Sequence, residues 1–135
     1  MDGTEKVVEH LKMTQVIINR LANNCVLVKG WSMTIILAVM VLITKHEIQI
    51  PYFVAVPLIL PIWILDGYFL RQERLFRQVY NEIRTKYDTD FEMNPIKHSK
   101  KPKCSWLSVI FSPTLITFYI VEIFFIMGVF AIIQK

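Results

Sequence analysis

The chain has 135 residues, of which 54% are hydrophobic and 19% are charged, with a formal net charge of +4. This hydrophobic share, together with a mean hydropathy of +0.44, lies above the range of ordinary soluble domains. The apolar residues gather in three stretches, and the segments between them are too short to bury cores of their own. The composition therefore excludes an ordinary soluble enzyme domain, and the excess of basic residues indicates membrane topology rather than nucleic-acid binding.

A helix is predicted before the first apolar stretch. Apolar and small residues recur there at spacings of three and four, which is typical of a helix that packs lengthwise against another helix. Residues 1–25 are therefore predicted to form a cytosolic amphipathic helix that continues without a break into the membrane. The residues on this stripe are Val7, Leu11, Thr14, Ile18, Leu21, Cys25 and Val28.

The three apolar stretches cover about residues 26–44, 50–70 and 113–133. Each has about the 20 residues that a helix needs to cross the hydrocarbon core of a bilayer. We therefore expect an all-α integral membrane protein with three transmembrane helices. The first two form a transmembrane hairpin over residues 26–70, and residues 113–135 form the third transmembrane helix.

Basic residues predict the orientation of these helices. Thirteen of the 15 lysines and arginines lie near the start of the first stretch or earlier, or between the second and third stretches. Basic residues are enriched on the cytoplasmic side of membrane proteins. The N-terminus and the long middle segment are therefore predicted to be cytoplasmic, with the turn after Lys45 and the C-terminus outside.

The second transmembrane helix is predicted to continue beyond the membrane as a cytosolic extension over residues 71–87. Pairs of opposite charge four residues apart, such as Glu73 with Arg77, favour a helix there. The first two helices would then form a long hairpin that extends into the cytosol. The predicted packing stripe of the extension is Phe69, Glu73, Phe76, Tyr80, Ile83 and Tyr87.

A basic loop and an interfacial segment are predicted over residues 88–112. Asn94 and Pro95 break the helical pattern, and the apolar residues 106–111 are typical of a short helix lying in the membrane interface. Ser112 is a suitable N-cap residue and Pro113 a suitable first residue of the helix that follows.

Glu122 lies near the middle of the third stretch, where a charged side chain costs about 3 kcal/mol unless it is protonated, paired or facing water. One interpretation is that it lines an ion path or pore formed by several copies of the chain. The other is that it is neutral and hydrogen-bonded to a neighbouring helix, with Thr34, Thr117 or Tyr119 as candidate partners. The two interpretations predict different surroundings for the carboxyl group.

Asp66 lies close to the predicted inner end of the second transmembrane helix. An ion pair with Arg71 or Arg74 would anchor the membrane boundary. Contact with Lys29 would instead connect the two helices of the hairpin, and a coupling role in gating is a further alternative.

Two groups of basic residues follow the second stretch. Arginine side chains can bind phosphate groups bidentately, so lipid head groups, or an anionic second messenger or nucleotide bound between subunits, could occupy the first group. Attraction to anionic lipid explains the second group. The first group is Arg71, Arg74 and Arg77, and the second is Lys97, Lys100, Lys101 and Lys103.

The remaining polar residues predict no catalytic site. His10, His46 and His98 are isolated in the sequence, and the two cysteines, Cys25 and Cys104, are predicted on the reducing side of the membrane, where disulfides are disfavoured. We therefore expect no metal, no cofactor, no specific nucleic acid and no enzymatic activity.

Two segments look like those of small bacterial membrane proteins: LVKGWS at residues 27–32 and LDGYFLRQERLFRQVY at residues 65–80. The arrangement over residues 7–87 resembles the two-transmembrane effector domains found beside bacterial nucleotide-signalling and other antiphage systems. This resemblance implies an oligomeric effector that perturbs the inner membrane. The third stretch and its Glu122 depart from the two-helix pattern of that family.

Two functions from different classes remain open at the level of sequence. The first is a homo-oligomeric effector that forms a pore or disrupts the bacterial inner membrane in antiphage defence, controlled by a cytosolic signal or partner. The second is a non-catalytic membrane anchor or regulatory subunit that recruits a soluble partner protein. Glu122 distinguishes them, because a pore requires it to face a water-filled axis and an anchor requires only a hydrogen bond.

Overall fold

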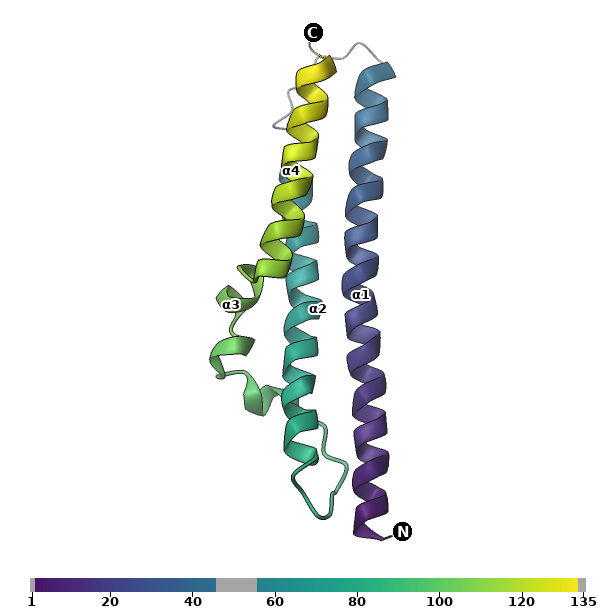
Figure 1. The fold of residues 1–135 in the computed structure, drawn as a ribbon, viewed down its shortest axis with the longest axis vertical. Helices are drawn as coiled ribbons and strands as arrows, with labels where there is room; N and C mark the ends of the chain where they lie inside the picture. The colour runs from purple at the N-terminus through teal and green to yellow at the C-terminus, as the bar shows by residue number, and fades with distance from the viewer. Residues whose placement is uncertain (1, 46–55, 134–135) are drawn as a thin grey trace.

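The computed structural model describes residues 2–45 and 56–133. Within these two ranges the chain is helical and contains no strand. Figure 1 shows a long, narrow arrangement with α1 and α2 side by side and α4 beside their upper part. The elements are α1 (Gly3–Lys45), α2 (Val56–Ile83), η2 (Pro95–His98), η3 (Pro102–Cys104), α3 (Trp106–Ile110) and α4 (Pro113–Ile133).

The α1 helix is continuous over 43 residues, which corresponds to about 65 Å at 1.5 Å per residue. The predicted unbroken helix is therefore confirmed. Of the predicted stripe, Leu11 and Leu21 are half-buried, and the other residues are less than a tenth exposed. The buried members are Val7, Thr14, Ile18, Cys25 and Val28.

The α2 helix packs antiparallel to α1. Val7 of α1 meets Val79 and Ile83 near the end of α2, whereas Ile36 shares a cluster with Ile59 near the start of α2. Leu75, Val79 and Ile83 are the buried residues near the C-terminal end of α2, spaced four residues apart.

The predicted packing stripe of α2 is only partly buried. Phe69, Phe76 and Tyr80 are half-buried, and Tyr87 lies beyond the helix and is 96% exposed. The cause is that α2 is in contact with α1 on one side and with η2, η3 and α3 on another, so its buried surface is not the single stripe that sequence spacing predicts.

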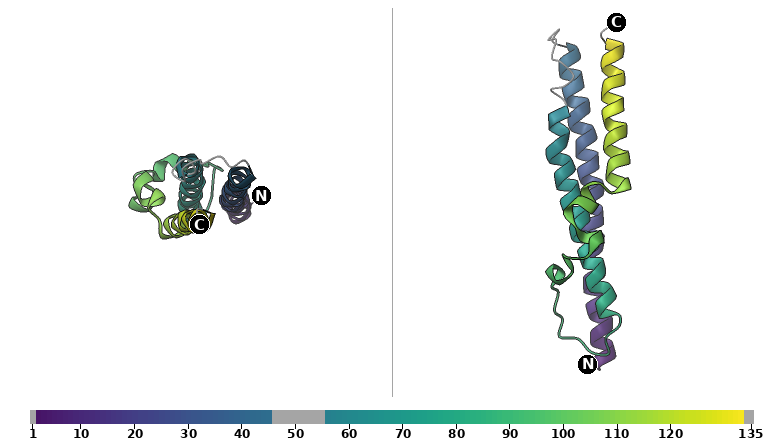
Figure 2. Two further views of the ribbon diagram at one scale, coloured as in Figure 1. Left: turned by 90° about the horizontal axis from the view of Figure 1, so that it is seen from above. Right: turned by 90° about the vertical axis from the view of Figure 1, so that its left-hand side faces the viewer.

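The α4 helix packs against both α1 and α2 (Figure 2). Its residues Leu115, Tyr119, Ile126 and Phe130 join a cluster with buried residues of the other two helices. We call α4, with residues 28–42 of α1 and 59–70 of α2, the three-helix section. Residues 3–20 of α1 and 75–83 of α2 form the two-helix section.

Two of these helices are long and apolar enough to cross a membrane, namely Gly3–Leu42 of α1 and Pro113–Ile132 of α4. Only 28% of the most hydrophobic window of each is buried within the chain, so most of that apolar surface faces outward. The predicted second transmembrane helix includes residues 50–55, which lie outside the described residues, as do the predicted turn and His46. The described part of α2 is not among the candidate spans, and a third span stays a prediction.

The segment from η2 to α3 lies against the side of α2 that faces away from α1 (Figures 1 and 2). The short predicted helix is present as α3. Gly67 allows the close approach there, because an added Cβ would lie 3.3 Å from Cγ1 of Ile110. As expected, α4 begins at Pro113, and Ser112 precedes it with a carbonyl that accepts from the amide of Ile116, although the Oγ of Ser112 makes no hydrogen bond.

Candidate functional sites

A buried ion pair joins α1 to α2 inside the three-helix section. Nζ of Lys29 lies 2.5 Å from Oδ2 of Asp66, whose side chain is fully buried. The hydroxyl of Tyr119 on α4 donates to the same oxygen at 3.2 Å. Of the sequence alternatives for Asp66, the contact with Lys29 is the one present, and the tyrosine extends it to a third helix.

A second polar contact joins α1 to α4. The Oγ of Ser32 lies 2.8 and 2.9 Å from the two carboxyl oxygens of Glu122, and the glutamate is only 3% exposed. Ser32 was not among the expected partners of Glu122. Of the expected partners, Thr34 instead donates to the carbonyl of Gly30 in its own helix.

The two polar contacts are stacked one helical turn apart. Lys29 and Ser32 are three residues apart on α1, and Tyr119 and Glu122 are three residues apart on α4, so each pair lies on one face of its helix. Beyond Glu122 the buried residues contributed by the three helices are apolar: Ile36, Met40, Ile59, Ile126 and Phe130. In the described part of the chain, the buried polar groups therefore form no continuous path along the whole section.

The arginines of the predicted basic ridge bind protein acceptors. Nε of Arg71 donates to the carbonyl of Cys104 at 3.0 Å, and Arg74 donates to the carbonyls of Lys103 and Ser108. Arg77 pairs with Glu73 in its own helix at 2.8 Å. Two of these guanidinium groups therefore hold the segment between α2 and α4 against α2, and the third pairs within α2. Together they do not form one open anion site.

The lysines of the second basic group have different surroundings. Lys97 pairs with Glu92 at 2.6 Å, and Lys101 donates to the side chain of Gln78 at 2.8 Å. Lys100 and Lys103 are exposed, and the structure shows no hydrogen bond or ion pair for their side chains within the described ranges. The group is therefore only partly neutralised by the chain itself.

A histidine is buried where α1 meets the loop that follows α2. His10 is 1% exposed, its Nδ1 lies 2.7 Å from Oγ1 of Thr89, and its ring packs against Phe91. Phe91 has a φ of 61°, which is uncommon for a bulky residue. Burial, the largest cause, lowers the pKa of His10, Lys86 lowers it further, and Asp90 opposes both.

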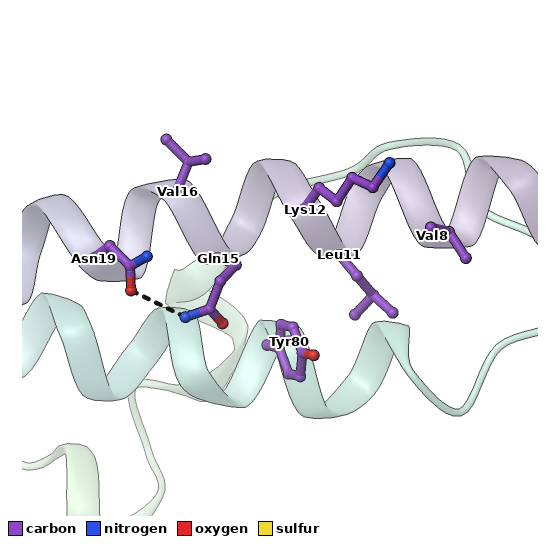
Figure 3. Close-up of a pocket in the computed structure, with 7 residues that line it drawn as sticks. All are labelled: Val8, Leu11, Lys12, Gln15, Val16, Asn19 and Tyr80. Atoms are coloured by element: carbon purple, nitrogen blue, oxygen red, sulfur yellow. Dashed lines mark hydrogen bonds between the residues drawn. The ribbon is translucent and has the colours of Figure 1, made fainter.

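The flank of the two-helix section carries an apolar groove of about 490 Å³, shown in Figure 3. Two of its apolar residues on α1, Val8 and Val16, are 46% and 58% exposed. The side-chain oxygen of Asn19 accepts a hydrogen bond from Gln15 in its own helix at 3.0 Å. The groove is lined by Val8, Leu11, Lys12, Gln15, Val16, Asn19 and Tyr80.

Metal-binding groups are absent from the described residues: no three His, Cys, Asp or Glu side chains are placed to hold an ion. Comparison of the chain with known protein families, with curated proteins and with solved structures finds no match. The resemblance to antiphage effector domains therefore stays a prediction.

Proposed function

We propose that the chain is a non-catalytic membrane anchor or regulatory subunit, whose two-helix section recruits a soluble partner protein. The observation that carries this proposal is the apolar groove between α1 and α2. It lies outside the three apolar stretches, on the section that the distribution of basic residues predicts to be cytosolic.

The membrane part of the proposal is supported by α1 and α4. Both are long and apolar enough to cross a bilayer, and their apolar windows are mostly exposed. The buried acidic groups of α2 and α4 have partners on α1, since Asp66 binds Lys29 and Glu122 binds Ser32. A buried acid with such a partner does not require further copies of the chain to satisfy it.

The proposed occupant of the groove is an amphipathic helix of the partner protein. Two packed helices leave their flank open, and a third helix can bury apolar anchors spaced three and four residues apart in such a groove. Val8, Leu11 and Val16 provide the apolar contacts, and Lys12 at the edge favours an acidic residue on the incoming helix.

The test is site-specific photocrosslinking of the full chain in its native cell. A photoreactive side chain at Val16 lies in the groove, and one at Met13 gives a matched control, because Met13 is also an exposed apolar residue of α1 but does not line the groove. We expect a crosslink from position 16 to one soluble protein and none from position 13. Purified, that protein should bind the unmodified chain, and Val16→Glu should abolish binding.

Crosslinks from position 16 to lipid alone would contradict the proposal. A product with the mass of two copies of this chain would also contradict it and would favour self-association through the groove.

The pore or membrane-disrupting effector is the second candidate. The observation that favours it is the exposed apolar surface beside Glu122, where Val121 and Phe124 are 61% and 68% exposed. Copies of the chain could cover this surface and rearrange the helices around the carboxyl group. Control by a cytosolic signal, and a role in antiphage defence, belong to this candidate.

Membrane potential in bacteria that express the chain alone separates the candidates. A pore predicts depolarisation that Glu122→Leu abolishes at matched membrane abundance. The anchor predicts normal potential in both strains.

A further inference from the structure

The segment that joins α2 to α4 is basic and free of carboxylates. Between Asn94 and Pro113 the sequence contains four lysines and no Asp or Glu. Two of the lysines, Lys100 and Lys103, are exposed, and their ammonium groups have no hydrogen bond or ion pair among residues 2–45 and 56–133. This segment therefore presents positive charge that the described chain does not neutralise.

Side chains of α2 hold the same segment in place. Arg71 and Arg74 donate to the carbonyls of Cys104, Lys103 and Ser108. Arg71 also lies over the ring of Trp106, 5.3 Å from its centre. Their hydrogen bonds are used to position the backbone on which the lysines stand.

Trp63 of α2 adds a further contact with this segment, at the end of α3. Its indole Nε1 donates to the carbonyl of Ile110 at 3.2 Å. Hydrogen bonds from α2 thus hold the segment just before α3 and at the last residue of α3, close to the start of α4 at Pro113.

Exposed apolar side chains follow these lysines in the chain. Leu107 and Phe111 are 69% and 60% exposed, and Trp106 is 40% exposed. An apolar face beside lysines is typical of segments that lie in the membrane interface, with apolar groups in the acyl region and ammonium groups at the level of the phosphates.

From this arrangement we infer a binding site for the head groups of anionic phospholipids, in which Lys100 and Lys103 bind the phosphate and Leu107 and Phe111 contact the acyl chains. Arg71 and Arg74 act as positioning residues. The site rests on the membrane placement of α4 and does not depend on the partner groove. Each lysine near an anionic surface is expected to raise the affinity about fivefold.

The test uses the purified, delipidated full chain in a neutral detergent. Native mass spectrometry measures the binding of dioctanoyl phosphatidylglycerol and of dioctanoyl phosphatidylcholine. The variant K100Q/K103Q removes the two unpaired lysines, and R20Q/R84Q removes two exposed cations, one on α1 and one after α2, as a matched control. We expect an affinity for phosphatidylglycerol about 25-fold lower in K100Q/K103Q, less than a twofold change in R20Q/R84Q, and unchanged binding of phosphatidylcholine in both.

Equal losses in the two variants would overturn the inference, because they would show only a general effect of net charge. Competition by glycerol phosphate as strong as by the intact lipid would overturn it in favour of a free-phosphate site.

Circular dichroism checks that K100Q/K103Q remains folded. If it does not, Leu107→Ser provides the second test: a loss of affinity for phosphatidylglycerol is expected, and no loss would overturn the acyl contact. Crosslinking at Val16 is unaffected by these variants, so failure here and failure of the proposed function can be distinguished.

Discussion

The three-helix section and the two-helix section are stabilised in different ways. In the former, an apolar cluster contributed by α1, α2 and α4 encloses two polar contacts that join α1 to its neighbours. In the latter, two helices share a small cluster of Val7, Val79 and Ile83 with Leu11. Directional contacts therefore fix the register of the helices in the first section. The second section has few buried apolar contacts, so its local unfolding free energy is expected to be lower.

The largest effect is expected from Asp66→Ala, which would show whether the ion pair holds the three-helix section together. The substitution leaves the ammonium group of Lys29, whose side chain is 19% exposed, without its partner, which costs about 3 kcal/mol, the lower end of the range for breaking a buried pair. Reversible unfolding of the purified protein in mixed micelles with increasing SDS measures the loss. The double variant Lys29→Met with Asp66→Leu removes both charges and should recover most of the stability. An equal loss in the double variant would show that the pair has no special role.

A smaller effect is expected from Ser32→Ala. The carboxyl group of Glu122 then loses its only hydrogen-bond donor among the described residues, at a cost of about 1–3 kcal/mol. The matched control is Thr34→Ala, because Thr34 is exposed and its hydroxyl bonds within its own helix. The same SDS titration compares them, and equal stabilities of the two variants would contradict the assignment of Glu122 to Ser32.

The two-helix section should respond to pH through His10. Burial lowers its folded pKa below the usual value of about 6.5, so the unfolded chain binds more protons in the interval between the two values. The contribution of neutral, buried His10 to the unfolding free energy is therefore fully present above about pH 6.5 and is lost as the pH falls toward the folded pKa. The groups facing the ring are Thr89, Asp90 and Lys86.

Hydrogen exchange of the loop after α2 measures this effect. After correction for the intrinsic rate, its amides should exchange faster at pH 5.5 than at pH 7.5, while those of α4 change little. His10→Leu should remove the difference. A pH dependence that persists in this variant would assign it to another group.

The smallest effect is expected from Arg77→Gln. Its pair with Glu73 is exposed on the arginine side, at 60%, and such helix pairs contribute about 0.3–0.5 kcal/mol. The change in unfolding free energy should vanish at high salt, because solvent screens an exposed pair. A loss as large as that of Ser32→Ala would mean that the arginine has a partner other than Glu73.

Hydropathy and spacing predicted the helical class, the continuity of α1 and most of its buried stripe. These properties depend on local sequence periods. The partners of buried polar groups depend on the relative register of distant helices, and local sequence does not contain it. Ser32 lies three residues after Lys29 and four before Ile36, so continuing the stripe of α1 would have placed it inward, although not against Glu122.

The surroundings of the arginines were also beyond the sequence. Arg71 and Arg74 bind backbone carbonyls. Every residue has a backbone carbonyl, whatever its side chain, so no residue type in the sequence indicates these contacts. The missing hydrogen bond of the Ser112 hydroxyl is a similar case, because its side chain is buried, at 2% exposure, by residues distant in the sequence.

The equal spacing of Lys29 with Ser32 and of Tyr119 with Glu122 has a consequence for how this chain can vary. One residue inserted between Tyr119 and Glu122 would rotate the glutamate by about 100° around α4 and carry it away from Ser32 while Tyr119 kept its place. An insertion in the loop between α2 and η2 leaves both contacts intact. A chain can therefore lengthen in that loop without breaking either contact of the three-helix section, but it must keep the three-residue intervals on both α1 and α4.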